Sequence, residues 1–173
     1  MRAAIILPPK GFKDETVSFF KSFFAKWGIT PSIASYNNGE CVGYHGAAYK
    51  ADISALKVNP DEFDIILVPE GPGIDAYKLY DYKPLLDTLR AFSSAKKTLI
   101  ATGNAVSVLA RASALVDTKV AVHENSETVR LVRIYHGIIS NKPLESDKNV
   151  ITAKSSDSNS EIAKLVLEKF GLK

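Results

Sequence analysis

Short apolar runs bounded by turn residues recur along the chain and predict the strands of a sheet. The clearest runs lack the alternation of apolar and polar residues seen in half-exposed strands, which is typical of parallel strands buried on both faces. The run that ends at Val68, before Pro69, predicts the central strand. The predicted strands cover Ala3–Leu7, Ile29–Ser35, Asp64–Val68, Lys97–Ala101 and Val150–Ala153.

Between these runs, apolar residues recur at every third or fourth position, which predicts amphipathic helices. The first helix carries an apolar face that ends at Gly28; the face consists of Val17, Phe20, Phe23, Phe24 and Trp27. The same period predicts helices over Asp75–Phe92, with Pro84 opening a fresh helix, over Asn104–Leu115 and over Ser160–Phe170. Ser158 or Ser160 is expected to cap the last of them, and Gly171 to end it.

Three segments have weaker patterns. Glu40–Lys50 follows the turn signal Asn37-Asn38-Gly39 and predicts one or two short strands. Lys119–Val122 predicts a strand. Val129–Ile139 also predicts a strand, with a hairpin through His136-Gly137 as the alternative.

Strands that alternate with helices predict an α/β fold: a three-layer, doubly wound, mainly parallel sheet with helices on both faces. The length of 173 residues suits one domain, so residues 1–173 are expected to form a single unit. Sheets of this kind place their sites at the carboxyl ends of the strands, near the point where the strand order reverses.

Composition narrows the classes of partner. The net charge is +3, and the 22 Lys and Arg residues are spread along the chain, so no basic stripe for nucleic acid is expected. The apolar run near the N-terminus is too short for a signal peptide and no run is long enough to cross a bilayer, which predicts a cytoplasmic protein without membrane contact. The single cysteine excludes an internal disulfide and a multi-cysteine metal cluster.

Three strand ends carry unusual chemistry. The segments are Pro8–Glu15 after the first strand, Pro69–Asp75 after the central strand and Thr102–Ala105 after the next one. The last opens directly into a helix, as a nucleophile elbow does. The free backbone N–H groups at that helix start predict a place for an anion or oxyanion.

These features resemble the ThiJ/PfpI superfamily, which has the class I glutamine amidotransferase-like (flavodoxin-like) fold. Phe63–Gly71 is similar to that family's strand ending in a Pro-Gly-Gly turn, and Gly39–Asp52 to the hairpin that precedes it. Leu109–Leu115 is similar to the helix after the elbow, and Asn149–Ala153 with Ser160–Ala163 to the last strand and helix. The resemblance covers nearly the whole chain.

The resemblance assigns site positions and exposes departures. The family's nucleophilic cysteine falls on Gly103, and the histidine that follows it in the protease-like branch falls on Asn104. The glutamate after the Pro-Gly-Gly turn falls on Asp75, and the first glycine of that turn is Glu70. A second family acid falls near Glu15, although the spacing fits Thr16 equally well. His123 corresponds more weakly to a histidine of the regulator-like branch.

A glycine at the elbow keeps the turn but supplies no nucleophile. Thr102 is expected to point to the other face of the strand, and Ser107 to project away from the elbow. Cys41 is expected to be an incidental thiol, partly exposed or on an edge strand. Cys41 and His45 would share a metal ion only if the chain folded back between them.

Two functions follow from these residues. The first is a catalytically degenerate protein without thiol-dependent peptidase, amidase or deglycase activity, which keeps a binding or assembly role. The alternative is a small-molecule hydrolase, hydratase or lyase that uses the acid–base residues Glu15, Glu70, Asp75 and His123. Glu70 and Asp75 could instead cap the following helix.

The remaining expectations concern ligands and assembly. The resemblance implies a homodimer or a larger homo-oligomer, and the elbow predicts a small-molecule ligand. A ligand sensor, or a subunit of a hetero-complex, is a third alternative. No cofactor and no metal ion are expected.

Overall fold

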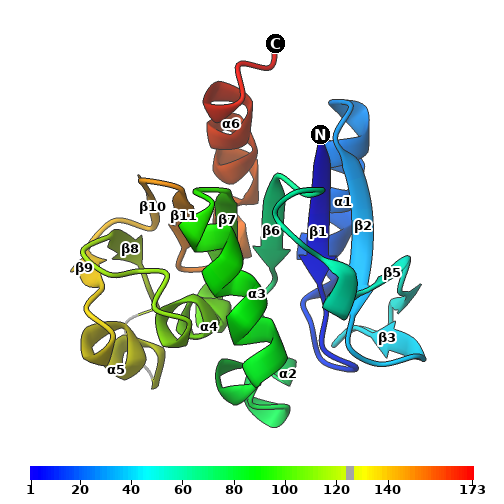
Figure 1. Ribbon diagram of the computed structural model, residues 1–173, viewed down its shortest axis with the longest axis horizontal. Helices are drawn as coiled ribbons and strands as arrows, with labels where there is room; N and C mark the ends of the chain where they lie inside the picture. Colours follow the sequence, from blue (N-terminus) through cyan, green and yellow to red (C-terminus); the bar gives the residue numbers. More distant parts are fainter. Residues whose placement is uncertain (124–126) are drawn as a thin grey trace.

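The computed structural model describes residues 1–123 and 127–173. Within these residues, seven strands form one sheet in the order β10-β11-β7-β6-β1-β2-β5 (Figure 1). Its strands are β1 (Arg2–Ile6), β2 (Thr30–Ser35), β5 (Ile53–Ser54), β6 (Ile65–Val68), β7 (Thr98–Thr102), β10 (Leu144–Asp147) and β11 (Val150–Ala153). All neighbours are parallel except β10 and β11, so the predicted mainly parallel α/β fold is confirmed.

Burial on both faces explains why the strands are continuous apolar runs. All four residues of β6 are buried. Ile65 and Leu67 pack into one apolar cluster, while Ile66 and Val68 pack into the other. This alternation follows from the pleat of a strand, in which successive side chains point to opposite faces.

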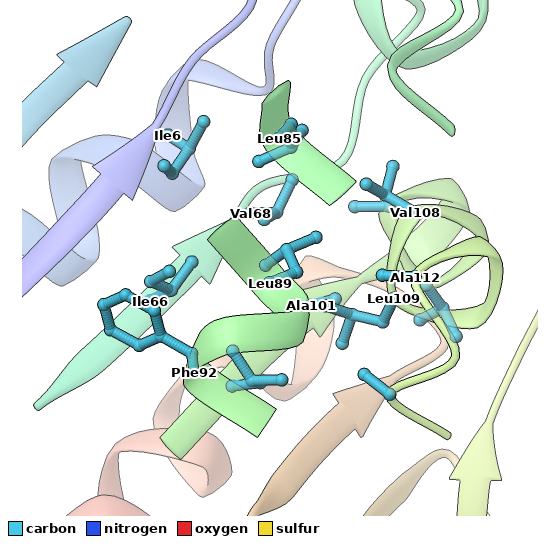
Figure 2. Packing of buried hydrophobic residues seen from close by; sticks show 14 of the residues in the cluster. Ile6, Ile66, Val68, Leu85, Leu89, Phe92, Ala101, Val108, Leu109 and Ala112 are labelled. Carbon is cyan, nitrogen blue, oxygen red and sulfur yellow. The ribbon is translucent and has the colours of Figure 1, made fainter. Parts of the chain in front are cut away.

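Helices cover both faces. On one face, α1 (Asp14–Lys26) and α6 (Asn159–Lys169) pack against the sheet through residues such as Phe20 and Ile162. On the other, α3 (Lys83–Ser94) and α4 (Val106–Arg111) are packed, and α3 crosses in front of the sheet in Figure 1. Figure 2 shows Leu85, Leu89 and Phe92 of α3 beside Ile66 and Val68 of β6.

Most predicted helices are confirmed with small changes in their bounds. Helix α1 ends before Gly28, and Pro84 lies in the first turn of α3. The segment before Pro84 forms two short pieces, α2 (Gly73–Ala76) and η2 (Leu79–Asp81), rather than one longer helix. Ser158 is at the cap position of α6, but its side chain makes no capping hydrogen bond, so the expected side-chain cap is wrong.

One predicted strand is wrong. Val129–Ile139 forms α5 (Glu127–Ile134) followed by β9 (Ile138–Ser140), which pairs in parallel with β8 (Lys119–Ala121). The β-branched valines suggested a strand, but Thr128 and Val132 lie one helical turn apart and are both buried. Packing of this face against α4 stabilises a helix here in place of the predicted strand.

Two further segments complete the chain around the sheet. β3 (Glu40–Val42) and β4 (Ala48–Lys50) pair as an antiparallel hairpin, as predicted for Glu40–Lys50. β10 was not predicted from the pattern, because its residues Leu144–Asp147 are mostly polar and lie at the edge of the sheet. Short 3-10 turns complete the described part: η1 (Ala55–Lys57), η3 (Gly103–Ala105) and η4 (Ser156–Ser158).

The topology places the strand ends together. The strand order reverses at β1, which has β2 on one side and β6 on the other. The carboxyl ends of β1, β6 and β7 lie at the lower side of Figure 1, beside α2, while both termini lie at the upper side. Among the described helices, none is long and apolar enough to cross a membrane.

Candidate functional site

The elbow predicted after β7 is present. Strand β7 ends at Thr102, Gly103 begins the turn η3, and α4 follows at Val106. Gly103 has φ of 54°, a left-handed conformation that costs an L-residue with a side chain roughly 1–2 kcal/mol. Glycine is therefore the residue that holds this turn at the lowest cost in backbone strain.

The carboxyl group of Glu70 fills the space beside Gly103. A Cβ atom added at Gly103 would overlap Oε2 of Glu70 and would lie 2.8 Å from its Cβ and 2.9 Å from its Cδ. Real Cβ atoms do not approach other heavy atoms this closely. A side chain at position 103 and the observed Glu70 conformation therefore exclude each other.

Three segments hold Glu70 in place. Oε1 accepts a hydrogen bond from the backbone N–H of Ser156 at 2.7 Å. The Glu70 backbone N–H donates to Oγ1 of Thr102 at 3.3 Å, and its carbonyl oxygen accepts from the Lys13 N–H at 2.8 Å. Burial raises the pKa of Glu70, although the charge of Lys13 and the hydrogen bond from Ser156 act in the opposite direction.

Asn104 ties the elbow to the loop after β6. Its Nδ2 donates to the carbonyl oxygen of Gly71 at 2.8 Å, and its Oδ1 accepts from the Gly71 N–H at 3.1 Å. Nδ2 also lies 3.4 Å from Oδ2 of Asp75. This reciprocal pair makes Asn104 a positioning residue for the Glu70-Gly71 segment.

A pocket of about 510 Å³ opens above the elbow. This volume lies in the range of small-molecule sites. Its walls combine carboxylates, cations and imidazoles from five parts of the chain, and they consist of Lys13, Tyr44, His45, Glu70, Gly71, Pro72, Asp75, Gly103, Asn104, His123, Thr128 and Lys154.

The structure brings together most of the residues that the sequence singled out. Glu70, Asp75 and His123 line the pocket with Gly103 and Asn104. The other proposed acid position does not contribute a carboxylate to these walls. Glu15 is largely exposed and pairs with Nε2 of His45 at 3.7 Å, and Thr16 is buried, where its hydroxyl accepts from Asn159 at 3.4 Å.

The capping role considered for the two acids is wrong for Glu70, while Asp75 does lie at the N-terminal turn of a helix. Glu70 directs its carboxyl to Ser156 rather than to α2, and the cap residue Pro72 makes no side-chain bond. Asp75 lies within the first turn of α2, where its carboxylate contacts Asn104. For Glu70, a tertiary contact with Ser156 therefore replaces the local cap.

The sequence prediction missed several lining residues. Lys13 and Lys154 follow β1 and β11, so the rule that sites gather at the carboxyl ends of strands could have found both. Tyr44 and His45 lie in the β3–β4 turn, and Thr128 lies one residue before the segment Val129–Ile139 that was predicted to be a strand. No local signal in the sequence places the β3–β4 turn over the elbow.

Asp14 attaches the β3–β4 turn to the pocket. Its carboxylate accepts backbone hydrogen bonds from His45 and Ala47, both at 2.8 Å. Burial acts to raise the pKa of Asp14, but these two N–H donors outweigh it, so the pKa lies below its usual value. The charged form of Asp14 is therefore stabilised in the native protein.

We expect Asp14→Asn to lower the free energy of unfolding by about 1–3 kcal/mol at pH 7, because the amide offers one acceptor oxygen where two N–H groups need one each. A carboxylate with a lowered native pKa adds stability above the unfolded value of 3.8, and this stability is lost as the pH falls through the native pKa. In urea unfolding, the difference in free energy of unfolding between the native protein and Asp14→Asn should therefore shrink as the pH is lowered. Asp61→Asn, at an exposed position, should change little. A deficit of equal size at pH 7 and in acid would contradict the assignment.

Comparison with protein-family models decides the family, since residues 1–169 match the DJ-1/PfpI family. The chain belongs to the DJ-1/PfpI family. It is 30% identical over 156 residues to the uncharacterized protein MJ0967 of Methanocaldococcus jannaschii, covering 90% of this chain and 76% of that protein. Over 92 residues it is 28% identical to the deglycase TK1284 of Thermococcus kodakarensis, which covers 53% of this chain and 55% of the deglycase.

Solved structures agree on the fold. The ThiJ/PfpI domain protein of Brachyspira murdochii superposes with a TM-score of 0.89 at 22% identity, covering 98% of this chain and 96% of that one. A two-domain protein of Anabaena variabilis, with DJ-1/ThiJ/PfpI-like and ferritin-like domains, gives a TM-score of 0.90 at 16% identity. The superposed region covers 99% of this chain and 50% of the Anabaena variabilis chain. These likenesses confirm the class I glutamine amidotransferase-like fold.

Within the described residues of this DJ-1/PfpI chain, Cys41, Ser107 and Thr102 were considered as replacement nucleophiles, and each is buried or held in a hydrogen bond. Cys41 lies on β3 of the two-stranded hairpin, so the edge-strand alternative is confirmed, but the side chain is fully buried in the cluster around α1, so partial exposure is wrong. Burial raises the pKa of its thiol. Ser107 donates its hydroxyl to the carbonyl oxygen of Asn104 at 2.6 Å, and the Thr102 hydroxyl accepts the Glu70 N–H. The nearest polar side chain to the Cβ position of Gly103 is thus a carboxyl.

No metal site emerges from the described residues. Over 1–123 and 127–173, no group of three or more His, Cys, Asp and Glu side chains could hold an ion. The candidate pair also lies in different surroundings, since the Cys41 thiol is in the core and the His45 side chain is 60% exposed beside Glu15.

Proposed function

We propose that this DJ-1/PfpI protein binds a small polar molecule in the elbow pocket and has no thiol-dependent peptidase, amidase or deglycase activity. One observation carries the proposal: the elbow residue is Gly103, and the carboxyl of Glu70 occupies the space that a side chain at that position would need. A thiolate at the helix start is what thiol chemistry requires. The pocket itself is kept, with polar groups that can orient a ligand.

Two departures from the family pattern are linked in this proposal. The ThiJ/PfpI pattern has glycine where this chain has Glu70, and cysteine where it has Gly103. These two positions compete for one volume, because a side chain at position 103 would occupy the space of the Glu70 carboxyl. We propose that the glutamate at the end of β6 replaced the cysteine at the end of the neighbouring strand β7 as the side chain in this space. Both substitutions then belong to one change of function rather than to independent drift.

The alternative is an enzyme that uses acid–base residues as a small-molecule hydrolase, hydratase or lyase. The observation that favours it is the Glu70 carboxyl itself, whose pKa is raised by burial at the wall of a pocket that Asp75 and His123 also line. Carboxyls with raised pKa values in clefts are typical of proton-transfer residues. The names of the deglycase relatives are consistent with an enzyme of this fold.

The test restores the family's residue types at positions 70 and 103, one at a time and together. We expect the native protein and Gly103→Cys to be inactive on peptide, amide and methylglyoxal substrates, because the new cysteine collides with Glu70. The double variant Glu70→Gly/Gly103→Cys removes this collision and should gain thiol-dependent turnover that iodoacetamide abolishes. The matched control is Glu70→Gly/Gly39→Cys, since a side chain at Gly39 meets no atom within 4 Å and would report unspecific thiol reactions.

The outcomes separate the two functions. Turnover by the native protein that is lost in Glu70→Gln or Asp75→Ala would support the acid–base enzyme and overturn the binding role. Thiol-dependent turnover by the native protein would overturn both. The homo-oligomer and the cytoplasmic location remain predictions, and sedimentation velocity would check the first.

A further inference from the structure

A second pocket, of about 220 Å³, lies at the carboxyl ends of β1 and β2. Within the described residues it shares no lining residue with the elbow pocket, so the two are separate sites. The strand ends supply Leu7, Pro8 and Pro9 on one side and Ser35-Tyr36-Asn37 on another. The segment between α2 and α3 closes it with Tyr77, Leu79 and Tyr82.

The lining is aromatic and uncharged. Among the described residues, its walls include three tyrosine rings, two proline rings and two leucines, and no Asp, Glu, Lys or Arg. Burial raises the pKa of Tyr36 to about 12, which keeps that phenol neutral at ordinary pH. A pocket without charge favours a neutral ligand, because a buried ion would have no partner there.

The rings have a defined arrangement. Tyr36 packs against the apolar core, and its ring meets that of Tyr82 edge to face, with centroids 4.9 Å apart and an interplanar angle of 76°. Tyr77 and Tyr82 remain 42% and 38% exposed. Flat apolar faces held around a hollow suit a planar ring, since aromatic pairs prefer offset-stacked or edge-to-face contact.

Asn37 adds a directional group. Its Oδ1 already accepts from the Ser35 hydroxyl at 2.6 Å and lies 3.6 Å from the Cys41 thiol, which orients the amide. Within the described residues, its Nδ2 has no hydrogen-bond acceptor. The lining residue Asn37 therefore has a donor left for an acceptor atom of a ligand.

We propose that this pocket binds a neutral heteroaromatic compound of one or two rings, with the tyrosines contacting its faces and Asn37 donating to an acceptor atom in the ring. The size fits, because an apolar cavity of about 150 Å³ is enough to bind benzene. It also lies below the roughly 300–1,000 Å³ of sites for larger ligands. This site is additional to the elbow pocket and does not depend on Glu70 or Gly103.

The experiment titrates the ¹⁵N-labelled full chain with isoquinoline, which is neutral near pH 7 and carries a ring acceptor, and with indole, which carries a donor instead. We expect isoquinoline to shift the backbone amides of Leu7, Tyr36 and Asn37 and to bind more tightly than indole. Tyr82→Leu should weaken isoquinoline binding by about tenfold, the effect of roughly 1.4 kcal/mol for a lost aromatic contact. The matched control Tyr44→Leu alters an exposed tyrosine of the elbow pocket and should leave the affinity unchanged.

A second variant tests the donor. Asn37→Asp keeps the oxygen that accepts from Ser35 but replaces the donating amide, so the preference for isoquinoline over indole should disappear. The proposal is overturned if neither compound shifts these amides, if Tyr44→Leu reduces binding as much as Tyr82→Leu, or if the native protein forms a dimer that protects Tyr77 and Tyr82. Failure of the Glu70→Gly/Gly103→Cys variant to gain thiol-dependent turnover would count against the function proposed for the elbow pocket and not against this site.

Discussion

Replacing Gly103 by alanine should lower the free energy of unfolding by about 2–5 kcal/mol, a large effect for a single methyl group. Part of it is the left-handed backbone at φ of 54°, which costs a residue with a Cβ roughly 1–2 kcal/mol. The rest arises because the new Cβ displaces Glu70 and leaves the Ser156 N–H without its acceptor, at a cost of about 1–3 kcal/mol.

A double-mutant cycle separates the two contributions. In a Glu70→Gly background the collision is gone, so Gly103→Ala should cost only about 1–2 kcal/mol, and the coupling energy measured by urea unfolding should be about 1–3 kcal/mol. Gly39→Ala, which meets open space, is the control and should change stability by less than about 0.5 kcal/mol. Strict additivity of the two substitutions would mean that Glu70 and position 103 do not compete for one volume.

Phe92→Ala should lower the free energy of unfolding by about 3–5 kcal/mol, since the ring is fully buried between α3 and the sheet. Figure 2 shows this ring beside Ile66. At roughly 2–4 °C per kcal/mol for a chain of this length, the midpoint of thermal unfolding should fall by about 10 °C. Calorimetry and urea unfolding measure the two quantities.

Controls for this truncation separate the cavity from other effects. Phe92→Leu keeps most of the volume and should cost clearly less than the alanine variant. Tyr44→Ala, at a side chain 67% exposed, should stay within about 0.5 kcal/mol. A small effect of Phe92→Ala, no larger than that of Tyr44→Ala, would show that α3 contributes little to the core.

The fold was predictable because its signals are local. The apolar runs of β1, β6 and β7 are buried on both faces, and a strand of this kind needs no information from distant residues to be identified. The stripe on α1 likewise matches the face that packs on the sheet. The prediction failed in two segments. β10 is a polar edge strand, and α5 contains β-branched residues that are typical of strands.

The candidate site was predictable only in part. The rule that the carboxyl ends of parallel strands converge predicted that Glu70, Asp75 and Gly103 lie close together, and the structure places all three at one pocket. The rule does not specify the direction in which each side chain points. Glu15 lies only two residues after the pocket's Lys13, yet it does not line the pocket: its exposed side chain pairs with Nε2 of His45. The rotation of a helix about its axis is set by packing, which the local sequence does not report.

The sequence alone determined most of the order of strands and helices, although not α5 and β10, together with the mainly parallel sheet and the absence of a side chain at position 103. Each of these depends on residue type and spacing. Only the tertiary structure decided that the Glu70 carboxyl lies against Gly103, that Cys41 is sealed in the core, and that Asn37 and three tyrosines border a second pocket. These are contacts between residues far apart in the chain. They depend on side-chain direction and packing across strands, quantities that no single stretch of sequence contains.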